Sequence, residues 1–139
     1  MTRNQTVEIN HLTVLQIQYL TELEQLEKGR GTIGAVATKC GVKHPTVSRF
    51  FKSCIEKGYL TESLEFTDKG KKMLRWHQKV QKDVREYLER SGITEGIDDV
   101  LKGMIENIDY RRLEELTKSH MRINKEIRMQ KEQNQIRNI

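Results

Sequence analysis

Residues Ile33–Phe50, with the sequence IGAVATKCGVKHPTVSRF, have the spacing of a helix-turn-helix. Ala37 provides a small residue where two helices can cross closely, and Gly41, four residues later, can supply the positive φ that a tight turn needs. Pro45 fits the first turn of the second helix, because its missing N–H would be unpaired there. Apolar residues at the other fixed positions would close the corner between the helices: Ile33, Val36, Val47 and Phe50.

The second helix, expected to begin near His44-Pro45 and to end at Gly58, is polar and basic on the face away from this corner. That face carries no acidic residue before Glu56. Arginine can bond guanine bidentately, serine and threonine can bond bases or phosphates, and lysine favours phosphates. We expect Arg49 to read a base, whereas His44 is either a groove contact or a helix-capping residue. The DNA contacts expected on this helix are Lys43, His44, Thr46, Ser48, Arg49, Lys52 and Ser53.

Two short β segments, at 59–62 and 64–67, are predicted to form a hairpin around a tight turn near Ser63. A hairpin directly after the second helix makes the domain a winged helix. The wing has few residues between its strands and an acidic or neutral tip. We therefore do not expect the wing to enter the minor groove.

A long helix is predicted from Thr67 or Asp68 to about Arg90, where Ser91-Gly92 would break it. Its apolar stripe is expected to comprise Met73, Trp76, Val80, Val84 and Tyr87. A helix N-terminus attracts phosphate, and this one is rich in lysine. We therefore expect three further contacts to the DNA backbone, from Lys69, Lys71 and Lys72.

Three more helices are predicted from hydrophobic spacing and capping residues. An amphipathic helix is expected over residues 10–27. A glycine within residues 28–31 would end it in a left-handed conformation, and Thr32 would cap the next helix. Residues 94–108 show another helical apolar face, and Asp109 can cap a last helix.

The last helix carries a heptad-like seam over residues 113–134 that is polar at three of its seven positions. One interpretation is a helix that extends a dimer. The other, which we favour, is a helix that docks on its own subunit and frays after about Arg128.

Charge is distributed unevenly along the chain. Residues 28–57 have seven bases and one acid, residues 69–82 have six bases and no acid, and residues 83–116 have five bases and ten acids. Basic surfaces of this kind suit a polyanion such as DNA. Because only 35% of the 139 residues are hydrophobic and 32% are charged, we expect a thin core that a dimer would supplement.

Cys40 and Cys54 lie in apolar helical patterns, so we expect reduced core thiols in a cytoplasmic protein. No stretch approaches the roughly 20 apolar residues that a membrane span needs. The first residues also have no apolar signal core, and no membrane partner is expected.

The chain contains the stretches VKHPTVS (42–48), EKGYL (56–60) and FTDKGKK (66–72). Together they resemble the diphtheria-toxin-repressor-like family, and the manganese-transport-regulator-like branch is nearest in length. The resemblance covers roughly residues 12–116. It implies a homodimeric repressor that binds palindromic operators through its winged helix and dimerises through about residues 73–116.

The same resemblance implies a co-repressor metal held by acids and histidines on three helices. At the matching positions this chain has other residue types: Leu15 or Gln16, Gln18, Gln81 and residues 101–105, LKGMI. Manganese or iron needs several anionic or imidazole ligands, and only His77 and Glu106 lie near these positions. We therefore expect no metal cofactor, with manganese or iron disfavoured, and we expect His77 at a helix surface or an interface.

These patterns predict a mainly α-helical chain with a winged helix-turn-helix DNA-binding domain at residues 1–72. A helical dimerisation region at 73–116 and a basic polar helical tail at 117–139 would follow. We expect a homodimeric transcription regulator, a repressor by resemblance, that binds double-stranded DNA at a palindromic operator and whose small-molecule effector is unknown.

Three alternatives remain open at this point. They are a small-molecule-responsive regulator like the multiple-antibiotic-resistance regulators, a metal-dependent repressor with a shifted site, and a winged-helix protein–protein adaptor. An enzyme is not expected, because Gly29-Arg30-Gly31 lacks the lysine and the preceding strand of a phosphate-binding loop.

Overall fold

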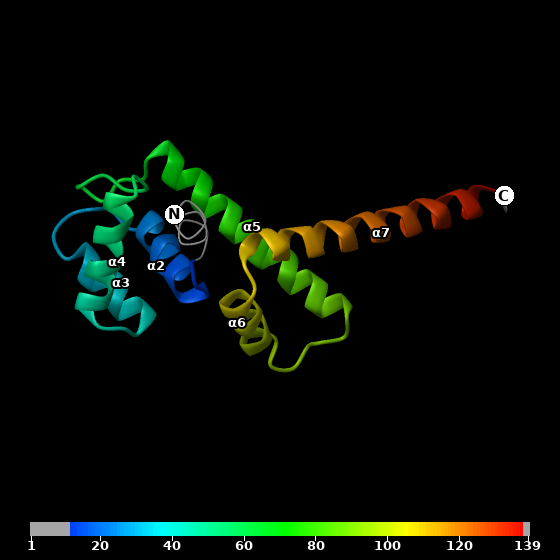
Figure 1. The fold of residues 1–139 in the computed structure, drawn as a ribbon, viewed down its shortest axis with the longest axis horizontal. Helices are drawn as coiled ribbons and strands as arrows, with labels where there is room; N and C mark the ends of the chain where they lie inside the picture. Colours follow the sequence, from blue (N-terminus) through cyan, green and yellow to red (C-terminus); the bar gives the residue numbers. More distant parts are fainter. Residues whose placement is uncertain (1–11, 138–139) are drawn as a thin grey trace, which may run out of the picture. The chain divides into compact units, whose positions relative to one another are not determined.

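The computed structural model describes residues 12–137, and helices dominate this part of the chain (Figure 1). In order they are α2 (Val14–Gln25), α3 (Thr32–Cys40), α4 (His44–Glu56), α5 (Asp68–Arg90), α6 (Ile97–Asn107) and α7 (Tyr110–Arg137). The chain divides into two compact units, one that ends at Gln81 and one that begins at Lys82, so α5 contributes to both. The prediction of a mainly α-helical fold is confirmed.

Helix α2 begins with a capping box. The Thr13 hydroxyl accepts from the Gln16 backbone N–H at 3.1 Å, and the Gln16 side chain accepts from the Thr13 N–H at 3.0 Å. The predicted start at residue 10 lies outside the described residues. The predicted glycine exit is wrong, because α2 ends at Gln25 and its C-cap, Leu26, has an extended conformation.

In the loop between α2 and α3, the glycine in the left-handed conformation lies just before α3 rather than just after α2. Gly31, with φ of 79°, is the N-cap of α3 and makes no side-chain cap bond. Thr32 is therefore the first helical residue rather than the predicted cap. Its hydroxyl donates to the Gly29 carbonyl at 2.8 Å and accepts from the Gly29 N–H at 3.0 Å, which closes the loop locally.

Helices α3 and α4 form the predicted helix-turn-helix. Gly41 adopts a φ of 68° at the end of α3, and the Val42 N–H donates to the Ala37 carbonyl at 3.0 Å. Pro45 lies in the first turn of α4. The corner residues pack into the core of the first unit, where Val36, Ala37 and Val47 are buried, with Ile33 and Phe50 partly buried beside them.

One hydrophobic core holds the first unit together. Helix α2 contributes Leu20 and Leu23, α4 contributes Phe51 and Cys54, and α5 contributes Leu74. Complete burial of a leucine or phenylalanine side chain stabilises a fold by about 1.5–3 kcal/mol. These contacts fix α4 by its apolar side and leave its polar side toward solvent.

The predicted pair of β segments is wrong in extent. Within residues 12–137 the wing is a single antiparallel bridge between Leu60 and Phe66, and no longer strand is formed. The Thr61 N–H donates to the Glu65 carbonyl at 2.8 Å, and Leu64 adopts a φ of 63°. The turn occupies residues 61–65. Few residues therefore remain between α4 and the turn, or between the turn and α5, to form a longer ladder.

Helix α5 begins at a closely packed junction with the wing. The Thr67 hydroxyl donates to the Gly58 carbonyl at 2.6 Å and accepts from the Gly70 N–H at 3.0 Å. Gly70 lies against the Tyr59 carbonyl, so that a Cβ at residue 70 would come within 2.8 Å of the Tyr59 carbonyl carbon. The backbone approach explains why glycine occupies a helical position here.

The buried face of α5 is shifted from the predicted stripe. Trp76 and Tyr87 are only half-buried, and the buried positions are Met73, Leu74, His77, Val80, Val84 and Leu88. The expectation of a surface or interface His77 is wrong, because its side chain is completely buried. Its Nδ1 lies 2.7 Å from the Met73 carbonyl oxygen one turn earlier, which satisfies a polar atom in the core.

The second unit packs the end of α5 against α6 and the start of α7. Its buried side chains are Val84, Leu88, Leu101, Ile105, Tyr110, Leu113 and Thr117. Gly92 adopts a φ of 89° after α5, and the Asp109 carboxylate accepts from the Arg112 N–H at 3.0 Å. The predicted break after α5 and the predicted cap of the last helix are therefore confirmed.

Helix α7 continues well beyond its packed first part. The ring of His120 meets Tyr87 edge-on, with centroids 4.8 Å apart, whereas Ile123 and Ile127 are 55% and 45% exposed. The helix is continuous to Arg137 rather than frayed after about Arg128. Among the described residues, no helix is long and apolar enough to cross a membrane.

The two cysteines are free thiols of different accessibility. Cys54 is buried and Cys40 is half-buried, and burial raises the pKa of the Cys54 thiol to about 12. We predict that a thiol reagent at pH 8 modifies Cys40 first and reaches Cys54 only on unfolding. The folded state favours the neutral Cys54 thiol. The contribution of this thiol to the stability of the fold is therefore present below pH 9 and is lost as the pH rises toward 12. Rapid modification of both thiols in the folded protein would contradict this prediction.

Candidate nucleic-acid interface

Helix α4 presents the predicted polar face to solvent. Val47, Phe51 and Cys54 anchor the opposite side of the helix in the core. The side chains of the predicted face are exposed at Lys43, His44, Thr46, Arg49 and Lys52 and half-buried at Ser48 and Ser53. Six of these seven residues therefore lie on one amphipathic helix, and the seventh, Lys43, is its N-cap.

The cations of this face differ from three other cations in the same unit. Lys28, Lys39 and Arg75 pair with glutamates at 3.4, 3.3 and 2.6 Å. Arg49 and Lys52 make no ion pair or side-chain hydrogen bond within the described range. Their full positive charge is therefore available to an external anion.

The start of α4 removes one of the two interpretations of His44. The N-cap is Lys43, with φ of −79° and ψ of 144°, and it makes no side-chain cap bond. His44 is the first helical residue and its side chain is exposed. It does not cap the helix, and its contact with the groove stays a prediction.

The three lysines at the start of α5 are not equivalent. Lys69 Nζ donates to the Lys57 carbonyl at 2.9 Å and lies 5.2 Å from the centroid of the Tyr59 ring. This lysine ties the first turn of α5 to the end of α4. Lys71 and Lys72 are exposed, and neither pairs with an acidic residue in the part of the chain that the structure describes.

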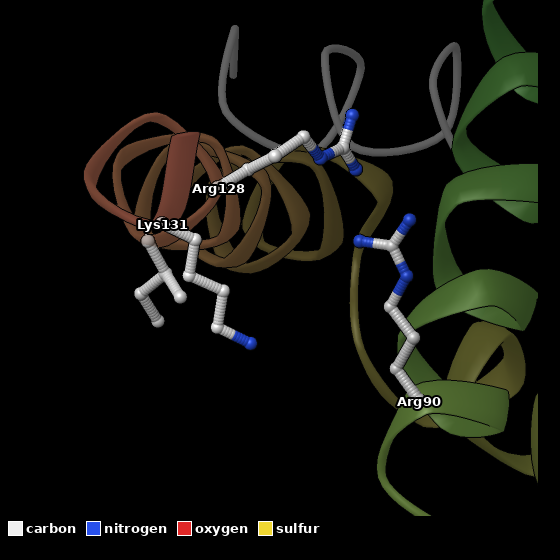
Figure 2. Close-up of a pocket in the computed structure, with 4 residues that line it drawn as sticks. Arg90, Arg128 and Lys131 are labelled. Carbon is white, nitrogen blue, oxygen red and sulfur yellow. The ribbon is translucent and has the colours of Figure 1, made fainter. Parts of the chain in front are cut away.

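One basic cluster was not predicted from the sequence. Arg90, Arg128 and Lys131 line a hollow of the second unit together with Ile127 (Figure 2). The net positive charge of the tail was the only signal of this cluster, because Arg90 lies 38 residues before Arg128 in the chain.

Residues 12–137 contain no group of three His, Cys, Asp or Glu side chains that could hold a metal ion. Of the two candidate ligands that the sequence singled out, His77 is buried with its Nδ1 at the Met73 carbonyl. Glu106 is exposed on α6.

A helix-turn-helix followed by a minimal wing, with a basic face on its second helix, defines a winged helix-turn-helix domain. Folds of this class bind DNA through the second helix. Residues 10–94 match the family described as wHTH-PRTase associated, and because the match covers more than half of the chain, the protein belongs to this family. The match confirms the winged helix-turn-helix part of the resemblance but gives no support to the diphtheria-toxin-repressor-like family. No curated protein and no solved structure matches the chain.

Proposed function

We propose that this protein is a sequence-specific DNA-binding transcription regulator that acts as a homodimeric repressor on a palindromic operator. The observation that carries the proposal is the exposed face of α4, where Arg49 and Lys52 have no ion-pair partner among residues 12–137. In this class the second helix enters the major groove, and dimers bind two half-sites about one helical turn apart.

Each side chain on this face has a role that follows from its chemistry. Arg49, one turn beyond the helix start, can present its guanidinium to the O6 and N7 atoms of a guanine. Thr46 and Ser48 can bond bases or phosphates, while Lys43 and Lys52 neutralise phosphates. The binding energy would come mainly from phosphate contacts and the choice of sequence from Arg49 and its neighbours.

The dimer part of the proposal is supported by apolar residues that remain at the surface of the second unit. Val100 and Leu116 are 37% and 39% exposed, and Ile123 follows on α7. Pairing two copies would cover this surface. It would also supply the two recognition helices that a palindrome requires.

The family description favours a second candidate function. The words "wHTH-PRTase associated" connect this winged helix to a PRTase. A winged-helix adaptor that binds such an enzyme would use a protein surface in place of DNA. Co-purification with a PRTase, without affinity for any duplex, would favour this candidate over the regulator.

The regulator can be tested by fluorescence anisotropy with duplex DNA from upstream of its own gene. The titrations would be run at several salt concentrations, with chelator and then with added manganese, iron(II) or zinc. We expect saturable binding that weakens steeply with salt and does not depend on metal. Absence of binding to this duplex and to a random duplex library would contradict the proposed function.

The same titration tests the start of α5. We predict that Lys71→Ala weakens binding to all duplexes alike and reduces the slope of log affinity against log salt by about one. Lys69→Ala should instead lower the stability of the turn after α4, because Lys69 is bonded to the Lys57 carbonyl. An unchanged slope in the Lys71 variant would remove the start of α5 from the interface.

A further inference from the structure

The second unit contains a hollow of about 470 Å³ between the end of α5 and the exposed part of α7. Arg90 reaches it from the last turn of α5, and Arg128 and Lys131 reach it from α7 (Figure 2). The spacing of three residues places Arg128 and Lys131 on the same side of α7. The contact of Tyr87 with His120 holds the two helices together nearby.

Within the described part of the chain, the three cations of this hollow have no acidic partner. Two other cations of the second unit are paired, Arg112 with Asp109 at 3.5 Å and Lys118 with Glu114 at 3.4 Å. Arg90, Arg128 and Lys131 make no ion pair with any residue between 12 and 137. The three positive charges around this opening repel each other. An anion in the hollow would reduce this repulsion and would also accept hydrogen bonds from the three side chains.

We propose that this hollow binds a small molecule that carries a diphosphate group. Two guanidinium forks can each bond a phosphate bidentately, and the lysine supplies a third charge for the same group. The volume falls in the range of about 300–1,000 Å³ that is typical of small-molecule sites. Ile127 adds an apolar wall against which a sugar or a base can pack. The proposal does not depend on DNA binding by α4.

Isothermal titration calorimetry of the full chain with inorganic diphosphate and with ADP tests this site. We expect saturable binding of one ligand per chain. Arg128→Gln combined with Lys131→Gln should weaken it at least about ten-fold, because each residue supplies a charge-assisted hydrogen bond. The matched control is Arg122→Gln combined with Lys125→Gln, which removes the same charge from exposed positions of α7 at the same spacing. This control should weaken binding less than about two-fold, since general attraction is screened by salt.

A comparison of ADP with inorganic diphosphate shows whether the bound diphosphate group belongs to a nucleotide or is free diphosphate. Tighter binding of ADP, lost in Ile127→Ser, indicates a nucleotide, whereas equal binding indicates diphosphate itself. Three results would overturn the proposal: no binding of either probe, equal weakening by both variant pairs, or competition of both probes by sulfate at equal concentration.

A contact to DNA would have a different signature. If the cluster bound a duplex backbone, Arg128→Gln combined with Lys131→Gln would flatten the salt slope for DNA while diphosphate failed to bind. That result would also overturn the small-molecule site, and it would leave the role of α4 in DNA binding intact. Circular dichroism of both variant pairs establishes that α7 remains helical.

Discussion

Gly70→Ala is expected to destabilise the first unit by about 3 kcal/mol, because its Cβ would overlap the Tyr59 carbonyl and only a backbone shift could relieve it. An alanine in a helix normally stabilises by up to about 1 kcal/mol relative to glycine, so the close approach reverses the usual sign. Urea unfolding followed by the fluorescence of Trp76, the single tryptophan, reports on this unit. The Thr67 hydroxyl, which bonds Gly58 and Gly70 across the same junction, leaves little freedom for a shift.

Gly103→Ala is the matched control for this prediction. Gly103 lies inside α6, where a Cβ would meet no atom within 4 Å and φ is not positive. The same chemical change should therefore stabilise the second unit by about 0.5–1 kcal/mol, measured by the helical circular dichroism signal. A Gly70 variant as stable as the unchanged protein would contradict the packing at the start of α5.

Arg49→Ala is expected to reduce discrimination between the preferred operator and a duplex with one changed guanine by about 1–3 kcal/mol. Arg49 is exposed on α4 and unpaired within the described residues, so its loss leaves the fold unchanged. Competition anisotropy with the two duplexes measures this difference. A bidentate contact to one base pair predicts that the variant loses its preference at that position and keeps the others.

Arg111→Ala provides the control for charge alone. Arg111 is exposed at the start of α7, and its removal changes the net charge by the same amount. It should leave operator discrimination unchanged. If Arg49→Ala lowered affinity for every duplex equally, Arg49 would be a phosphate contact rather than a base contact.

The features predicted correctly from the sequence are those set by neighbouring residues. The turn at Gly41, the start of α4 at Pro45 and the cap at Asp109 each need one residue type at one position. Local chemistry is sufficient for such features, because a left-handed glycine or a capping carboxylate acts within a few residues.

The features predicted wrongly depend on contacts between distant segments. His77 looked like a surface residue because one helical stripe does not reveal that a second, overlapping face is also covered. The bond of Lys69 to the Lys57 carbonyl was missed for the same reason, because Lys57 lies outside the helical pattern of α5. The length of the two β segments in the wing was predicted wrongly for a related reason, because β propensity does not determine where the turn between them begins.

The family resemblance shows the same division. The helix-turn-helix motifs encode an architecture that many regulators share, and they identified the winged helix. They could not select among families of that class, and the match over residues 10–94 assigns a different one. Residues that carry a particular function lie at positions that the common motif leaves free.

The most direct test of DNA recognition by α4 is an amide NMR titration with the tightest duplex selected from a random library. The predicted result is that the largest shifts fall on residues 43–53 and on Lys71 and Lys72, with few changes in α6. Recognition of DNA by α4 would be contradicted if the largest chemical-shift changes fell on α7 around Arg128. It would also be contradicted if no selected duplex changed the amide chemical shifts of α4.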